Sequence, residues 1–119
     1  MTVSTIAFDP RTTVLHLSDG TLTVSRTDTT TTYRVGGSID LANAADLRDA
    51  LRDEPVGDVV LDLTAVDFFG TAALTVVAAL DDACGDRGSR LTLRVGDAVA
   101  RVMVAARWEP SAHVVDVRG

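Results

Sequence analysis

A single hydroxyl side chain, that of Thr71, stands where its chemistry could matter. It follows Phe69-Gly70, between an apolar run typical of a buried strand and an apolar run typical of a helix. In an α/β sheet, the segments that leave the carboxyl ends of strands bind ligands and partners. A phosphate on Thr71 would lie at a helix N-terminus, where the helix dipole and free amides favour negative charge. A threonine there can also simply cap the helix, and chemistry alone favours the cap.

The other polar candidates fit structural interpretations better. Paired carboxylates can perform acid–base catalysis, but isolated acids at strand or helix ends are usually solvated, and four such residues occur in the middle of the chain: Asp62, Asp67, Asp81 and Asp82. The sequence Gly36-Gly37-Ser38 could bind an anion, but it lacks the GxGxxG spacing, so we interpret the glycines as the end of a strand.

The histidines and the cysteine also have structural interpretations. His16 and His113 each lie in a β-prone run, where a half-exposed strand position explains them. Cys84 is interpreted as a small buried apolar residue near the end of a helix, and Trp108 as packing the exit of the last helix against the core. We therefore predict no catalytic residue, no metal site and no cofactor, and we expect that the protein is not an enzyme.

Composition narrows the possible functions further. The 119 residues suit one domain of 12.5 kDa, and 46% of them are hydrophobic, as in a globular protein. The chain contains no lysine, which excludes a phosphate-loop lysine and a Schiff base. A net charge of −6 disfavours binding to nucleic acids and anionic membranes and favours a partner with a basic face. No apolar run is long enough for a membrane span and the N-terminus does not resemble a signal peptide, so we expect a cytoplasmic protein.

Hydrophobic periodicity predicts strands and helices that alternate strictly after the first third of the chain. The predicted strands are 31–37, ended by Gly36-Gly37, then 58–63, 91–95 and 112–117. The predicted helices are 41–52, capped by Asp40, then 71–84, ended by Gly85, and 98–107, capped by Asp97, with a loop at 67–70. Such alternation requires crossover connections, so we predict an α/β fold with a mixed, mostly parallel β-sheet and helices packed on it.

The first part of the chain has a different pattern. Two β-prone runs, 12–17 and 21–26, are separated by Ser18-Asp19-Gly20, which is typical of a hairpin. We predict an N-terminal β-hairpin extension, placed at residues 1–21, that precedes a domain at 22–119. The hairpin could add strands to the edge of the sheet or form a dimer interface.

The central sequence resembles the STAS domain family, which includes the bacterial anti-sigma factor antagonists. Residues 59–63 (VVLDL) and 66–74 (VDFFGTAAL) resemble the family's hydrophobic strand and its Asp-Ser-(Ser/Ala)-Gly-Leu helix start. Residues 37–40 (GSID) resemble the Gly-x-(Leu/Ile)-Asp that opens an earlier helix. The resemblance runs from about Leu22 to Val117 and implies a STAS-like fold.

The resemblance also implies a function. Antagonists of this family bind an anti-sigma factor that is a serine kinase, and binding releases a sigma factor. The kinase then phosphorylates the hydroxyl at the helix start, which matches Thr71, and Asp40 matches an acidic residue beside it. The implied partner-binding residues are Asp40, Phe69, Gly70, Thr71, Ala72, Ala73 and Thr75. The protein would then regulate transcription, as in a stress response, by binding an anti-sigma factor, and could also bind a second copy of itself.

Two departures keep other functions open. Gly70 stands where the family has an acid, and Ala73 where it has a glycine. STAS subunits of lipid-transport ATPases often carry threonine at the position of Thr71, so an accessory subunit of such an ABC-type transporter is the alternative. A small enzyme or ligand-binding module, with the segment after Leu63 as the rim of a pocket, is the third.

Overall fold

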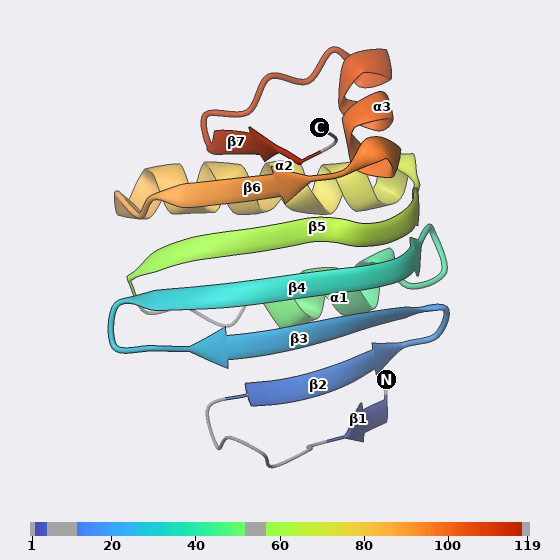
Figure 1. Ribbon diagram of the computed structural model, residues 1–119, viewed down its shortest axis with the longest axis horizontal. Coiled ribbons are helices and arrows are strands. Elements are labelled where there is room, and N and C mark those ends of the chain that lie inside the picture. The colour runs from blue at the N-terminus through green and yellow to red at the C-terminus, as the bar shows by residue number, and fades with distance from the viewer. Residues whose placement is uncertain (1, 5–11, 52–56, 118–119) are drawn as a thin grey trace.

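The computed structural model describes residues 2–4, 12–51 and 57–117 (Figure 1). Within these ranges the chain forms strands and helices in the order β1 (Thr2–Ser4), β2 (Thr12–Leu17), β3 (Gly20–Arg26), β4 (Thr30–Ile39), α1 (Ala44–Leu51), β5 (Asp58–Phe69), α2 (Thr71–Arg87), β6 (Leu91–Val95), α3 (Asp97–Ala106) and β7 (His113–Asp116). The predicted order of strands and helices is confirmed, and β1 is a strand that was not predicted.

The strands form one seven-stranded sheet whose spatial order follows the sequence. β1 to β4 are antiparallel, whereas β4 to β7 are parallel and are connected by the three helices. This is the predicted mixed α/β sheet. The predicted hairpin is β2–β3, and it adds strands to the edge of the sheet, so the expected boundary near residue 21 falls inside β3.

The core lies between the sheet and the helices. Alternate residues of each central strand point to this side and are buried, among them Tyr33, Val35, Leu61, Leu63 and Leu93. Figure 1 shows α1 and α2 behind the sheet, while the near side of β2 to β6 carries no helix.

The prediction that Gly36-Gly37 ends a strand is wrong, because β4 continues to Ile39 with two register shifts against β5. Gly37 has φ +81, and a Cβ there would lie 2.5 Å from the carbonyl oxygen of Asp19. The two glycines therefore let the β2–β3 turn approach β4 closely, and neither needs to bind an anion.

The predicted loop at residues 67–70 is also wrong. β5 runs to Phe69, which pairs with Ile39, and Gly70 alone separates β5 from α2. Strand pairing overrides the local turn signal here. No loop follows Leu63, so the pocket rim expected for an enzyme does not exist at that position.

α2 begins at Thr71 as predicted, whereas several other helix boundaries differ from the prediction by one to three residues. α1 begins at Ala44, because Asp40 Oδ1 accepts the backbone N–H of Ala42 at 2.9 Å and closes a turn first. α2 ends at the left-handed Gly88, not at Gly85. At α3 the N-cap position is Gly96, and Asp97 is the first helical residue, so the expected cap by Asp97 is wrong.

Candidate functional site

The carboxyl ends of β4 and β5 bring Asp40 and Thr71 to the same edge of the sheet. Ile39 pairs with Phe69, and the backbone N–H of Gly70 donates to the carbonyl of Ile39 at 2.8 Å. A Cβ built on Gly70 would lie 3.4 Å from the Cα of Asp40. Asp40, the connection after β4 and the start of α2 are therefore adjacent, although about thirty residues separate them in sequence.

Thr71 is the first residue of α2 and its side chain is exposed. The N-cap position is Gly70, which has extended backbone angles and cannot supply a side-chain cap. Within the described ranges no hydrogen bond engages the Thr71 hydroxyl; its carbonyl accepts one from the Thr75 hydroxyl at 3.2 Å. The interpretation of Thr71 as a cap is therefore wrong, and its hydroxyl is open to a partner.

Asn43, the only asparagine, fixes the shape of this edge, and sequence reasoning assigned it no role. It is buried, its Oδ1 accepts the N–H of Asp40 at 2.9 Å, and its Nδ2 donates to the carbonyls of Leu17 (2.6 Å) and Ser38 (2.9 Å). One side chain thus ties the end of β2, the end of β4 and the turn before α1 together. A lone asparagine three residues after a capping aspartate was the available signal.

The predicted partner-binding residues differ in their exposure to solvent. Thr71 and Thr75 are exposed and Asp40, Gly70 and Ala72 are partly exposed. Phe69 and Ala73 are core residues, 3% and 0% exposed, so they support the surface from beneath and present almost nothing to a partner. Burial follows from the pleat of β5 and the inner face of α2.

Two apolar side chains that sequence reasoning did not assign to the surface are exposed near this edge of the sheet. Leu41 is 84% exposed and Phe68 is 52% exposed. The Phe68 ring lies 3.5 Å from the position that a Cβ on Gly70 would occupy. We call the set consisting of Asp40, Leu41, Phe68, Gly70, Thr71, Ala72 and Thr75 the helix-start surface. It combines one carboxylate, two hydroxyls and two large apolar side chains that are exposed to solvent.

A second polar group lies across the middle of the sheet. Asp62 is 2% exposed, and its Oδ2 contacts Arg34 Nε at 3.5 Å and Arg94 Nη1 at 3.3 Å. Its Oδ1 accepts the Thr64 hydroxyl at 2.6 Å and the Thr64 N–H at 3.0 Å. Burial by itself raises the pKa of Asp62, but the hydrogen bonds from Thr64 and the charges of Arg94 and Arg34 outweigh it, so the pKa lies below its usual value. The expectation that Asp62 is solvated is wrong.

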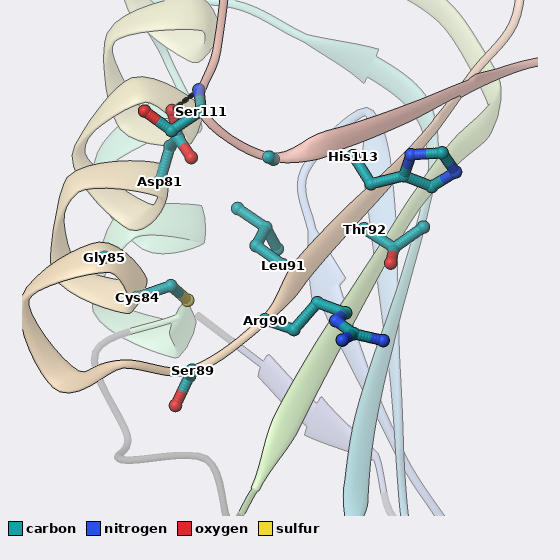
Figure 2. Close-up of a pocket in the computed structure, with 10 residues that line it drawn as sticks. Asp81, Cys84, Gly85, Ser89, Arg90, Leu91, Thr92, Ser111 and His113 are labelled. Atoms are coloured by element: carbon teal, nitrogen blue, oxygen red, sulfur yellow. Dashed lines mark hydrogen bonds between the residues drawn. The ribbon is translucent and has the colours of Figure 1, made fainter.

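A depression of about 560 Å³ lies near the far end of α2, beside β6 and β7 (Figure 2). Its polar groups are already engaged: Asp81 is buried and accepts the N–H of Ser111 at 2.9 Å, which corrects the expectation of a solvated acid. Cys84 is buried as expected, and burial raises the pKa of its thiol despite the nearby Arg87. In Figure 2, Arg90, Thr92 and His113 point away from Asp81 and Cys84.

The remaining candidate residues occupy structural positions. His16 and His113 are exposed strand residues, and Trp108 packs partly buried against the core, as expected. Over the described residues, no three His, Cys, Asp or Glu side chains are grouped so that they could hold a metal ion. No helix in the described part of the chain has the length and hydrophobicity to cross a bilayer.

Comparison with known families assigns the fold to one of them. A family model described as "Mlab, STAS domain" matches residues 22–116, which is most of the chain. The chain belongs to the STAS domain family. The resemblance noted in the sequence is thereby confirmed, and the match begins inside β3.

Two kinds of relatives carry a more specific name. The anti-sigma-F factor antagonist RsfB of Mycobacterium tuberculosis, in two strains, is 36% identical over 69 residues, which are 55% of this chain and 56% of RsfB. The aligned region thus spans about half the length of these curated relatives. The crystal structure of an anti-sigma factor antagonist from Mycobacterium paratuberculosis superposes with a TM-score of 0.70 at 25% identity, covering 84% of this chain and 89% of that one. The mixed sheet with its three helices is therefore the fold of a STAS-type antagonist.

Proposed function

We propose that this STAS protein is an anti-sigma factor antagonist that binds an anti-sigma factor through the helix-start surface and so releases a sigma factor. The observation that carries the proposal is the free Thr71 hydroxyl at the start of α2, at the edge of the sheet where Leu41 and Phe68 are also exposed. The names of the relatives support the antagonist function, and the partner is proposed by analogy with them. The protein would act in the cytoplasm and by binding, without catalysis.

The surface suits a protein partner with an apolar pocket and a basic rim. Leu41 and Phe68 are large side chains with much of their surface in water, so burying them favours association. Asp40 and the net charge of −6 favour a basic partner. The rigid backbone pairing of Ile39 with Phe69 keeps the two halves of the surface in place before binding, which limits the entropic cost.

We further propose that a serine/threonine kinase activity of the anti-sigma factor phosphorylates Thr71 and ends the interaction. The first turn of α2 contains no acidic residue, so its free N–H groups and dipole would accept the new phosphate. The same phosphate would place about two negative charges on the helix-start surface, where a partner needs an apolar contact.

The test of docking uses purified full-length protein and anti-sigma factors from the same genome, with affinity measured by calorimetry. Thr71→Ser should bind like wild type, while Thr71→Glu should weaken binding at least about tenfold, because it places a charge in the contact. The matched control is Ala83→Glu, which adds the same charge to an exposed position of α2 about 18 Å away. Equal binding of Thr71→Glu and wild type would contradict the helix-start surface.

The test of phosphorylation is separate. The protein is incubated with the anti-sigma factor and ATP, and its intact mass and phosphopeptides are measured. We expect one phosphate on wild type and on Thr75→Ala, and none on Thr71→Ala. Docking without any gain of mass would leave an antagonist that is not controlled at Thr71.

One observation favours a second candidate function. Gly70 replaces the acid that precedes the modified residue in the family, and threonine at position 71 is frequent in STAS subunits of lipid-transport ATPases. In that case the same surface would contact the ATPase and Thr71 would stay unmodified. Co-purification of a transporter ATPase with wild type, lost with Thr71→Glu, would favour this function over the first.

A further inference from the structure

Among the residues that the structure describes, no helix covers one side of β4 to β6, and we call this the bare side of the sheet. Strands β4 to β7 are parallel, and α1 and α2 lie on only one side of them (Figure 1). Parallel sheets are nearly always covered on both faces, in contrast to antiparallel ones. The bare side is therefore a surface that suits a partner.

The centre of this bare side is a row of charged residues across three strands. Arg34 pairs in register with Asp62, and Asp62 with Arg94. On β3 to β6, their neighbours in the row and in the adjacent row are short side chains: Thr23, Ser25, Thr32, Val60 and Thr92. On β7, Val115 pairs with Arg94 and His113 with Thr92. A partner can therefore reach the arginines without displacing bulky groups.

The carboxylate of Asp62 is fully used, but the arginines are not. Both guanidinium groups contact the same oxygen, Oδ2, at 3.5 and 3.3 Å, and Oδ1 is occupied by Thr64. The Arg34 and Arg94 side chains remain 65% and 43% exposed. Each guanidinium has five N–H donors, so most of them are available, and Asp62 holds both groups in position.

The local charge around this row is opposite in sign to the net charge of the chain. Two arginines share one carboxylate, so the centre of the bare side is positive, whereas the whole chain carries −6. Asp58 stands only at the border, where its carboxylate accepts the N–H of Arg90. A second copy would present the same positive row to this one, and nucleic acids are repelled by the net charge.

We propose that the bare side of β3 to β6 is a second docking surface, separate from the helix-start surface, and that it binds a carboxylate-rich segment of a partner protein through Arg34 and Arg94. Planar guanidinium groups bind carboxylates by paired hydrogen bonds, which gives both affinity and orientation. The surface does not involve Thr71, so an antagonist could engage two partners, or two parts of one partner, at once.

The experiment uses full-length protein and a labelled hexaglutamate peptide at low ionic strength, with amide chemical shifts and fluorescence anisotropy as readouts. In wild type, shifts should concentrate at Arg34, Arg94 and the threonines beside them. Binding should weaken at least about tenfold in Arg34→Gln/Arg94→Gln. The matched control, Arg48→Gln/Arg101→Gln, removes the same charge from exposed positions on α1 and α3 and should bind within about twofold of wild type.

A further variant separates loss of the surface from loss of the fold. Arg34→Lys/Arg94→Lys keeps Asp62 paired and should fold normally, but it should bind the peptide more weakly than wild type because lysine lacks the paired donors. The proposal is overturned if hexaglutamate does not shift the row, if both double glutamine variants lose affinity equally, or if the lysine variant binds like wild type. It is also overturned if wild type is a dimer that Arg34→Gln/Arg94→Gln converts to monomer, since a second copy would then be the occupant.

Discussion

Gly70 is the residue whose identity most affects the chemistry of Thr71. It occupies the N-cap of α2 without a capping side chain, and its φ of −79 and ψ of 170 are accessible to any residue. A Cβ at this position meets its nearest neighbours at 3.4 to 3.5 Å, which is ordinary contact. The structure therefore tolerates the acid that the family has at this position, and glycine is not required by the backbone.

Gly70→Asp should consequently stabilise the protein by a few tenths of a kcal/mol, because aspartate caps a helix better than glycine does and interacts well with the dipole. Chemical denaturation measures the gain. If Thr71 is a kinase substrate, the same variant should be phosphorylated faster, since the new carboxylate lies beside the hydroxyl. Gly85→Asp, at an exposed position in the last turns of α2, is the control and should stabilise nothing. A loss of stability in Gly70→Asp would show that the N-cap is more crowded than described.

Leu41 and Phe68 give a second prediction at the scale of the residue. Leu41→Ser should change the free energy of unfolding by less than about 0.5 kcal/mol, since its side chain is 84% exposed, whereas Phe68→Ser should lower it by about 1 kcal/mol, since Phe68 is about half buried. Each should weaken binding to the anti-sigma factor by about 1 kcal/mol or more, because the lost apolar area is buried only in the complex. Calorimetric titration of the folded variants checks this. Val104→Ser, at another exposed apolar position (74%), should leave affinity unchanged.

At the scale of the elements, periodicity predicted the types and the order well, because helix and strand periods differ and most segments are long enough to display them. It misplaced two strand ends. Gly36-Gly37 and the segment 67–69 carry local turn signals, yet both are drawn into β4 and β5 by parallel pairing with each other. Such pairing joins residues about thirty positions apart, which no local pattern can register.

For the candidate site too, some features could be predicted from the sequence and others could not. Asp40 and Thr71 could be placed together from the sequence, since both follow parallel strands at their carboxyl ends. The exposure of Leu41 and Phe68 could not, because a helical or strand pattern counts an apolar residue as core. Leu41 escapes the core because the turn closed by Asp40 and Asn43 precedes α1 and rotates it outward.

That turn depends on Asn43, which gives a prediction for the element. Asn43→Ala would leave the carbonyls of Leu17 and Ser38 and the N–H of Asp40 without their partner, at a cost of about 2–3 kcal/mol in the free energy of unfolding. Thermal unfolding should show a decrease of several degrees. Asn43→Asp keeps the acceptor for Asp40 but loses both donors, so it should not restore stability. An unchanged melting temperature in Asn43→Ala would mean that water replaces the side chain. Ser89→Ala, which changes a partly exposed side chain at the other end of the sheet, is the control.

At the scale of the molecule, the sheet separates two surfaces of different character. The carboxyl edge carries the helix-start surface, with its apolar side chains and Asp40, and the bare side carries the positive row. β5 links them, because Asp62 lies in its middle and Phe69 at its end. β5 thus holds the charge row in register and leads, through Gly70, into α2 at Thr71. Protonation of Asp62 should therefore affect the stability of the strand that supports both surfaces.

The pH dependence of stability tests this link. The pKa of Asp62 is lower in the folded protein than in the unfolded chain, so its carboxylate contributes stability above the unfolded pKa of about 4, and that contribution is lost as pH falls through the folded pKa. Asp62→Asn should lower the free energy of unfolding at pH 7 by about 1–3 kcal/mol, because Arg34 and Arg94 lose their shared counter-charge. As pH falls below about 4, the stabilities of wild type and variant should converge. Asp82→Asn, at an exposed position on α2, should run parallel to wild type throughout. A difference between Asp62→Asn and wild type that stays constant down to pH 2 would contradict the ionised, hydrogen-bonded Asp62, because a neutral side chain held only by packing would not respond to protons in this way.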